Sequence, residues 1–488
     1  MSPASADTRD ALRRIYEWWT YERALPALLF LAILLASALS PMQSDTWWQL
    51  RAGGDMWASG RVLLTDNYSH TAYGSFWPNH EWLAEVIFFA VYKIGGLPLL
   101  SLFTAALVLP AWAIVWRLTR GPSRRRFVLI ACALPVASMH WEPRPHAFSL
   151  LFVMITVALL LRRRDAWLPV VFWIWANCHG GVLVGLVVLI AALASDLLDG
   201  TRAWRPTLLL VAGCCVAVTL TPLGTSLWGE LIRSIERIRR YPLDEWKRPA
   251  VSDVRLLPYW LTVVGLLVVL LRRWRGLRAP GHRATRLLCV CAVAVLPLSI
   301  SAVRGVGTFL MLAVPAIAGV WSLDPVEQDR EYGAGRPALN AALAFSASLM
   351  VVVTLGCAYW YRIARLQWTP LPAASIRAVQ ECPGNLYNRY DEGGYLIWFA
   401  PDRPVFLDGR QDPYPSSLVL EQIEVEASGD FERLFDRHHI RCAFLPTISP
   451  LYPRLMAAGW SPLYHDRDWA VLADEPGRDL RARSLASR

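Results

Sequence analysis

Apolar segments long enough to cross a lipid bilayer recur along most of this 488-residue chain. A membrane-spanning helix needs roughly 20 mainly apolar residues. Charged residues make up only 18% of the chain, whereas soluble domains contain about 25%. The sequence therefore predicts an α-helical polytopic membrane protein and excludes a single soluble domain. We expect about 11 transmembrane helices, within residues 24–40, 97–118, 127–140, 146–161, 167–178, 181–198, 207–222, 256–271, 287–303, 305–322 and 339–360.

The distribution of arginine predicts how these helices are oriented, because cytoplasmic loops of membrane proteins are enriched in Lys and Arg. With the Arg-containing segment 1–23 in the cytoplasm, the arginine-rich loops fall on the cytoplasmic side as that rule requires. The loop 223–255 is an exception, since it is basic yet falls on the outer side. Its pattern of Leu231, Ile232 and Ile235 between arginines predicts an amphipathic surface helix. No basic stripe is interleaved with aromatic residues, so the charge does not indicate a nucleic-acid partner.

Residues 81–94 are apolar enough to be read as a further span, but Gly95 and Gly96 separate them from the next one. A crossing at this point would invert every later loop and place the arginine clusters outside. We therefore predict an interfacial helix that lies flat on the outer surface, within a long first outer loop at 41–96.

Beyond about residue 361 charges become frequent and apolar runs shorten. Alternating strand and helix patterns predict a small α/β domain there, outside the membrane. The expected domains are a cytoplasmic segment 1–23, a transmembrane domain 24–360 and the outer domain 361–488. Cys382 and Cys442 lie in the outer domain and could pair. The predicted strands are 394–399, 404–407, 442–445 and 469–472, and the predicted helices are 416–427, 430–438 and 450–458.

Polar residues gather where the predicted helices reach the outer side. Ionisable groups at membrane depth are costly and often functional. Tryptophan beside polar groups is also usual at a membrane surface, so it is the convergence of acids, histidines and arginines on one face that indicates a site. The candidate catalytic residues are Asp45, Asp66, His80 and Glu81, and the candidate substrate-binding residues are His140, Glu142, Arg144, His146, His179, Arg304, Asp408 and Arg410.

The chemistry that suits this set is group transfer from an anionic lipid head group. Asp45, just beyond the first membrane helix, can accept a proton from an acceptor hydroxyl. Arg144 and Arg304, supported by the histidines, can hold a phosphate leaving group. Asp45 with Asp66 or Glu81 could hold Mg²⁺ or Mn²⁺, provided that the loop folds back.

Two motifs in the outer domain are predicted as tight turns next to strands. Residues 391–394 (Asp-Glu-Gly-Gly) lead into one strand, and residues 408–410 (Asp-Gly-Arg) follow another. Glycine tolerates the backbone angles that such turns need. Acceptor binding by Asp408 and Arg410 is the alternative interpretation. The domain contains neither a P-loop nor GxGxxG, so nothing indicates soluble nucleotide-sugar chemistry.

These features together resemble the GT-C class of polytopic glycosyltransferases, which includes oligosaccharyltransferase subunits and protein O-mannosyltransferases. The likeness lies in an acid after the first membrane helix, a long first outer loop with interfacial helices, and a soluble domain outside. The motifs Asp45-Thr-Trp-Trp-Gln-Leu-Arg, Asp66-Asn-Tyr-Ser-His-Thr and Trp77-Pro-Asn-His-Glu-Trp also resemble a poorly characterised group of bacterial membrane proteins. Many GT-C enzymes carry two acids close together in the first loop, whereas Asp45 is followed by Thr46 and Trp47 and the next acid is Asp55, which favours a single-base mechanism.

The resemblance implies an enzyme of the bacterial inner membrane. It would transfer a sugar from a polyprenyl-phosphate donor to a lipid, glycan or protein acceptor on the periplasmic face, with Asp45 as base. A non-enzymatic transporter, flippase or assembly subunit for envelope polysaccharide is the alternative, although charges would then be expected deep within the helices. A lipid-linked ligase of the O-antigen type is a third hypothesis, with 223–255 as its functional loop.

Overall fold

The computed structural model describes residues 21–240, 244–277, 279, 281–323 and 366–474. It also describes residues 342, 345, 346, 349, 352 and 353. The chain forms two compact units. The helical unit comprises Met1–Pro41, Gly95–Thr225 and Pro242–Leu366, and the mixed unit comprises Met42–Ile94, Ser226–Tyr241 and Gln367–Arg488. The segment predicted as the first outer loop thus groups with the C-terminal segment.

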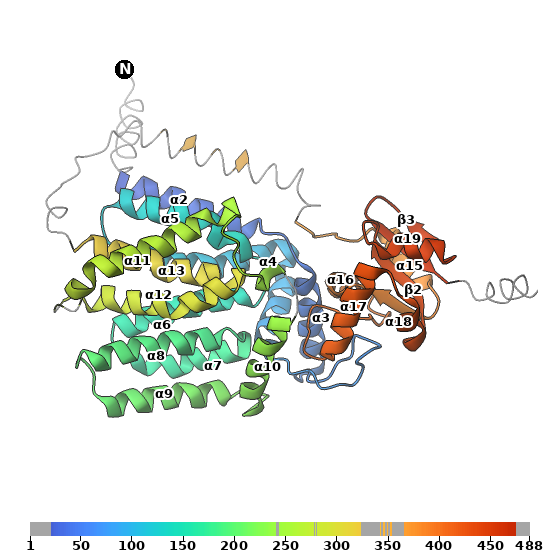
Figure 1. Ribbon diagram of the computed structural model, residues 1–488, viewed down its shortest axis with the longest axis horizontal. Coiled ribbons are helices and arrows are strands. Elements are labelled where there is room, and N and C mark those ends of the chain that lie inside the picture. Colours follow the sequence, from blue (N-terminus) through green and yellow to red (C-terminus); the bar gives the residue numbers. More distant parts are fainter. Residues whose placement is uncertain are drawn as a thin grey trace, which may run out of the picture. The chain divides into compact units, whose positions relative to one another are not determined.

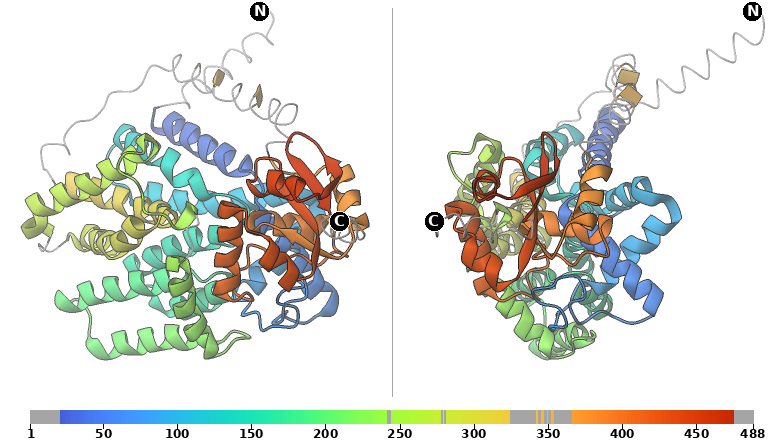
Figure 2. Two further views of the ribbon diagram at one scale, coloured as in Figure 1. Left: turned by 45° about the vertical axis from the view of Figure 1, so that its right-hand side comes forward. Right: turned by 90° about the vertical axis from the view of Figure 1, so that its right-hand side faces the viewer.

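The helical unit is a stack of apolar helices that run side by side in the views of Figures 1 and 2. Each of the first ten predicted spans coincides with a helix to within a few residues, and the eleventh, 339–360, lies outside the continuously described residues. The helices are α2 (Tyr21–Ala38), α4 (Trp82–Leu118, of which the part after Ile94 belongs here), α5 (Ser123–Ala137), α6 (His146–Leu161), α7 (Leu168–Cys178), α8 (Val182–Leu198), α9 (Trp204–Thr219), α11 (Leu257–Leu277), α12 (Arg283–Ser301) and α13 (Val306–Trp321).

Four of the described stretches are long and apolar enough to cross a membrane: Trp82–Leu118, Val254–Arg273, Arg283–Ser301 and Val303–Trp321. Three apolar helices, α6, α8 and α9, are shorter. The presence of the helices is therefore confirmed, and the number of crossings stays a prediction. The predicted break between 81–94 and the next span is confirmed as a kink, because Gly95 and Gly96 have non-helical backbone angles inside α4.

A buried ion cluster closes one end of the helical unit. Asp196, near the end of α8, is 1% exposed. Arg283, at the start of α12, donates to both of its carboxylate oxygens at 2.8 and 2.7 Å. Arg163 and Arg202 approach the same carboxylate at 3.1 and 3.5 Å. Arginines from three of the loops predicted to be cytoplasmic are therefore gathered at one end of α6, α8 and α12.

The mixed unit combines helices with a β-sheet, whose strands are drawn as arrows in Figure 2. The sheet has four strands in the order β1-β2-β4-β3. Strand β1 runs parallel to β2, and β4 runs antiparallel to both β2 and β3. The predicted amphipathic helix is present as α10. The elements are α3 (Ser44–Ser59), the first part of α4, α10 (Ser226–Arg240), α15 (Ala373–Glu381), β1 (Asn385–Asn388), α16 (Tyr390–Phe399), α17 (Ser416–Ser428), α18 (Glu432–Arg437), β2 (Ile440–Pro446), α19 (Leu451–Ala457), β3 (Ser461–His465) and β4 (Trp469–Ala473).

Two predicted strands of the outer domain are corrected by the structure. Residues 394–399 belong to helix α16, so the 391–394 motif is helical and not a turn. A short apolar run after two glycines reads equally well as strand or helix. The glycines instead allow α16 to pack closely against the start of α3. A Cβ on Gly394 would lie only 2.1 Å from the carbonyl oxygen of Ser44. At 404–407 only Val405 forms an isolated bridge, with Ser69. The predicted strands at 442–445 and 469–472 are β2 and β4, and β1 and β3 were not predicted.

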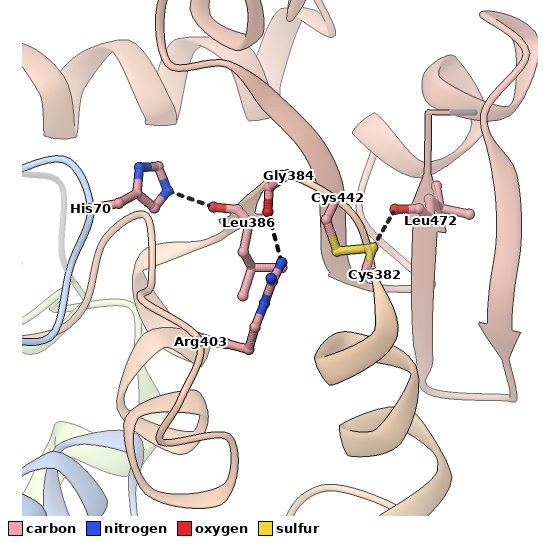
Figure 3. The surroundings of a disulfide bond; sticks show 7 residues. All are labelled: His70, Cys382, Gly384, Leu386, Arg403, Cys442 and Leu472. Carbon is pink, nitrogen blue, oxygen red and sulfur yellow. Dashed lines mark hydrogen bonds between the residues drawn. A yellow bond between two sulfur atoms is a disulfide. The ribbon is translucent and has the colours of Figure 1, made fainter. Parts of the chain in front are cut away.

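A disulfide and a set of hydrogen bonds join the pieces of the mixed unit. Cys382, after α15, is bonded to Cys442 in β2 (Figure 3), which realises the pairing that the sequence left open. In the same region Nε2 of His70 lies 2.9 Å from the carbonyl oxygen of Leu386 in β1. The hydroxyl of Thr71 donates to the carbonyl oxygen of Phe406 at 2.6 Å. Side chains of the loop after α3 thus hold it to backbone carbonyl groups of the C-terminal segment.

Candidate functional site

The end of the helical unit opposite Asp196 carries a second cluster of charges, which we call the basic cluster. Every member lies at a helix end or in a short loop. His140 ends the short helix η1 (Ser138–His140), His146 begins α6, and His179 follows α7. The other members are Arg144, Arg304 of η5 (Val303–Gly305) and Glu245 of η3 (Asp244–Trp246). The structure therefore brings together candidates that the sequence placed on one face.

Glu245 links the two arginines of the basic cluster. Its carboxylate accepts from Nη1 of Arg144 at 3.1 Å and from Nη1 of Arg304 at 2.9 Å. Burial raises the pKa of Glu245, but Arg304 and then Arg144 outweigh it and lower the pKa to about 2. The guanidinium of Arg304 also lies over the ring of Trp246, 5.2 Å from its centroid. Sequence analysis missed Glu245; the signal was the acid pair Asp244-Glu245 next to Trp246 in the basic loop 223–255.

The histidines of the basic cluster are held close together and largely out of water. The rings of His146 and His179 lie 5.6 Å apart. Burial, and then the charge of Arg304, lower the pKa of His140 to about 4, so this ring is neutral at pH 7. Its buried Nε2 has no hydrogen-bond partner among the described residues. Glu142 is also buried, and burial raises its pKa although Arg144 opposes the change.

The basic cluster places two guanidiniums close to three imidazole rings at helix ends. Both guanidiniums donate to the carboxylate of Glu245. Arginine pairs with imidazole donors are well suited to a phosphate oxyanion, because charge-assisted hydrogen bonds are the strong ones in proteins. The cluster can therefore bind an anion and stabilise negative charge that develops on it.

Asp45 lies in the first turn of α3, in the mixed unit. Its Oδ1 accepts from Nε1 of Trp48 at 3.0 Å. Gly409, at the centre of the 408–410 turn, packs directly against this carboxylate: a Cβ there would lie 2.0 Å from Oδ1 of Asp45. The N-terminus of α3 is fixed by the Gly394 amide, which donates to Oγ of Ser44 at 3.1 Å. Two motifs far apart in the chain thus meet at Asp45.

Asp66, Asp408 and Arg410 form one fully buried ion cluster, with no side-chain exposure for any of them. Nη2 of Arg410 lies 2.6 Å from Asp66 and 2.7 Å from Asp408. Its guanidinium is stacked between the rings of Tyr68 and Trp77, at 4.9 and 4.8 Å. A buried pair of this kind is costly to break. This setting favours a role in joining the outer loop to the C-terminal segment.

His80 and Glu81 are half-buried beside α3. Nε2 of Gln49, one turn after Asp45, donates to Glu81 at 3.3 Å. His80 lies 3.9 Å from the carboxylate of Asp412 and 3.8 Å from that of Glu81. Within the described ranges no group of three His, Cys, Asp or Glu side chains could hold a metal ion. Asp66, one of the acids that could have joined Asp45 in holding Mg²⁺ or Mn²⁺, is instead paired with Arg410, and no step below uses a metal ion.

Comparison with known proteins adds the fold class. No family model matches the chain, and none of the curated proteins matches it. Among solved structures, ArnT from Cupriavidus metallidurans in the apo state is similar over 92% of this chain and 97% of its own, at 15% identity and a TM-score of 0.51. The archaeal oligosaccharyltransferase AglB from Archaeoglobus fulgidus, in complex with an inhibitory peptide and a dolichol-phosphate, is similar over 86% of this chain and 69% of its own, at 12% identity and a TM-score of 0.52. At these identities the likeness concerns the fold, which is that of the GT-C membrane glycosyltransferases and confirms the resemblance seen in the sequence.

Proposed function

We propose that this protein is a glycosyltransferase of the bacterial inner membrane. It transfers a sugar from a polyprenyl-phosphate donor to a lipid, glycan or protein acceptor on the periplasmic face. The observation that carries the proposal is the gathering of Arg144, Arg304 and three histidines at helix ends of a GT-C fold. The likeness to an oligosaccharyltransferase that binds dolichol-phosphate supports the same class of donor.

The proposed reaction is a displacement at the anomeric carbon of the sugar. The acceptor oxygen forms a bond to that carbon while the bond from the carbon to the phosphate oxygen breaks. Asp45 takes the proton of the acceptor hydroxyl, and the electron pair of the broken bond leaves on the lipid phosphate. Arg144 and Arg304 stabilise the charge that appears there, which is the kind of contribution that preorganised donors make in a poorly solvated site.

The test compares two changes on the same helix. Asp45→Asn removes the base but keeps the size of the side chain, whereas Asp55→Asn alters an acid that pairs with Arg51 at 3.0 Å and accepts from Tyr68 at 2.8 Å. Purified protein in nanodiscs is given a panel of polyprenyl-phosphate sugars, and sugar transfer is followed. We expect Asp45→Asn to slow transfer by at least about hundredfold, with Asp55→Asn close to the native chain. Full activity in Asp45→Asn would show that another group is the base.

A further inference from the structure

The ion cluster around Asp196, at the end of the helical unit opposite the basic cluster, contains more arginines than acids. Three arginines share the carboxylate of Asp196. Arg202 also pairs with Asp165 at 2.7 Å, and Arg286 pairs with Asp199. We call this group the arginine end; its members are Arg163, Arg202, Arg283 and Arg286 with Asp165, Asp196 and Asp199. Among these residues four guanidiniums face three carboxylates.

Two of these arginines keep buried donor atoms that find no acceptor in the described part of the chain. The side chains of Arg202 and Arg286 are only 9% and 8% exposed. Nη2 of Arg202 and Nε of Arg286 lack a hydrogen-bond partner, against one acceptor in the same position, Oδ1 of Asp165. Next to the cluster, Arg162 and Arg164 are exposed and add two positive charges. The arginine end therefore presents a surplus of positive charge at its surface.

Arg163 is the most accessible of the paired arginines, with 37% of its side chain exposed. It follows α6 with a φ of +57°, a left-handed conformation that disfavours residues with a Cβ. The amides of Arg163 and Arg164 donate to the carbonyl oxygens of Leu160 and Leu159 at 3.3 and 3.0 Å. This is the pattern of a helix end that usually carries glycine at the left-handed position. Both oxygens of Asp196 already accept from another arginine, so the charge of Arg163 is not required to neutralise it.

An exposed apolar surface begins at the arginine end. Trp167 lies two residues after Asp165, directly before α7, and Trp204 begins α9 two residues after Arg202. Both rings are largely exposed, and so is Leu208, one turn further along α9. Helices α7 and α9 pack side by side (Figure 1). Since tryptophan at helix ends marks the depth of lipid head groups, the arginines lie where a head-group phosphate would be and the apolar surface lies where acyl chains would be.

We propose that the arginine end binds an anionic phospholipid, with its phosphate on Arg163 and the neighbouring exposed arginines and its acyl chains along α7 and α9. A phosphodiester supplies both the negative charge and the acceptor oxygens that the acids of the cluster leave lacking. A zwitterionic lipid would bring its own cation toward the guanidiniums. The inference does not rest on the proposed function, because the arginine end and the basic cluster lie at opposite ends of the helices. A free phosphate shares the head-group chemistry but not the acyl chains.

The first experiment uses the native full chain in a neutral detergent, with dimyristoyl phosphatidylglycerol as the probe. Dimyristoyl phosphatidylcholine controls for the acyl chains, and glycerol 3-phosphate controls for the charged head alone. Native mass spectrometry measures binding, and a phosphatidylglycerol with a diazirine in one acyl chain locates it. We expect phosphatidylglycerol to bind at least about tenfold more tightly than phosphatidylcholine. The photolabel should appear on Trp204–Thr219 and should be displaced by unlabelled phosphatidylglycerol but not by glycerol 3-phosphate.

Arg163→Gly then separates lipid binding from stability, because it removes a charge and places the preferred residue in the left-handed position. We expect it to bind phosphatidylglycerol about fivefold more weakly, with a melting temperature in lipid-free detergent close to that of the native chain. Adding Arg162→Gln and Arg164→Gln should weaken binding about hundredfold in total. Gln367→Gly, also at a φ of +57°, controls for the backbone change, and Arg255→Gln, at an exposed arginine, controls for the charge. Both controls should bind as the native chain does.

The contrary results are distinct from one another. Equal affinity of the native chain for the two phospholipids, or unchanged affinity in the triple variant, would overturn the proposal. Displacement of the photolabel by glycerol 3-phosphate at the same concentration would show a site for free phosphate compounds and overturn the lipid as the occupant. Label confined to other helices would overturn the location. None of these results bears on sugar transfer, so the proposed function would stand.

Discussion

Removing the charge of Glu245 should make the protein less stable and yet better at binding phosphate. The carboxylate has its pKa lowered from the usual 4.5 to about 2, because Arg304 and Arg144 outweigh the opposing effect of burial. One pKa unit corresponds to about 1.4 kcal/mol. The ionised group therefore contributes about 3 kcal/mol to stability. Little of this is lost to screening by water, because only 21% of the side chain is exposed.

The sign of the pH dependence follows from linkage. A carboxyl group whose pKa is lower in the folded state stabilises the fold above its unfolded pKa and loses that contribution as the pH falls through the folded value. The stability difference between the native chain and Glu245→Gln should thus be complete above pH 4.5 and disappear toward pH 2. The affinity changes in the opposite direction, since the carboxylate competes with a phosphate for the same two guanidiniums. We expect Glu245→Gln to bind farnesyl phosphate about tenfold more tightly at neutral pH.

The assay is thermal unfolding in detergent between pH 3 and pH 7, together with titration of farnesyl phosphate at pH 7. Glu424→Gln, the same substitution at an exposed position of α17, is the matched control and should change neither quantity. A variant that is less stable and also binds the probe more weakly would refute the reasoning, because simple damage to the fold gives that result. Unchanged stability would refute the ion pairs themselves.

Three further predictions concern other parts of the molecule. His140→Asn should flatten the pH dependence of stability between pH 6.5 and 4: the unfolded chain gains a proton on His140 there and the folded protein does not, which is worth about 2 kcal/mol after allowance for partial exposure. Asp196→Asn should lower the free energy of unfolding by about 3–5 kcal/mol, measured by denaturant titration, since three arginines lose their common partner; an effect under about 1 kcal/mol would contradict the buried cluster. Gly409→Ala should lower the rate of sugar transfer by more than its loss of thermal stability explains, because the new Cβ displaces the carboxylate of Asp45. Transfer at the native rate in this variant would show that Asp45 takes no part in the reaction.

The sequence was a good guide wherever one stretch of chain decides its own structure. Helix α6 was predicted at its observed bounds because an uninterrupted apolar run lies between His146 and Arg162. The kink at Gly95 and Gly96 followed from the same kind of local signal. Helix α16 was predicted as a strand because its glycines were read as a turn, whereas they allow contact with Ser44, a partner that no local pattern reveals.

In the candidate site, too, the sequence predicted what depends on local signals and missed what depends on contacts between distant segments. Counting crossings placed His140, His179 and Arg304 on one face, and the structure brings them together. The partners of these residues could not be predicted, since the pairing of Arg304 with Glu245 depends on how separate loops fold onto one another. The ion pair of Asp66 with Arg410 likewise joins segments far apart in the chain, and its burial is a property of the folded state alone.

The most direct test of the proposed function is release of polyprenyl phosphate during sugar transfer. Purified protein in nanodiscs is given labelled polyprenyl-phosphate sugars with candidate acceptors, and both products are quantified for the native chain, Arg304→Gln and Arg255→Gln. Arg255 is an exposed arginine paired with Asp253 at 2.8 Å, so its loss controls for the change in charge. We predict equal release of lipid phosphate and transferred sugar by the native chain and Arg255→Gln, and a loss of at least about hundredfold in Arg304→Gln. Equal turnover in Arg304→Gln, or no turnover of any donor by well-folded native protein, would contradict a glycosyltransferase that holds its donor phosphate in the basic cluster.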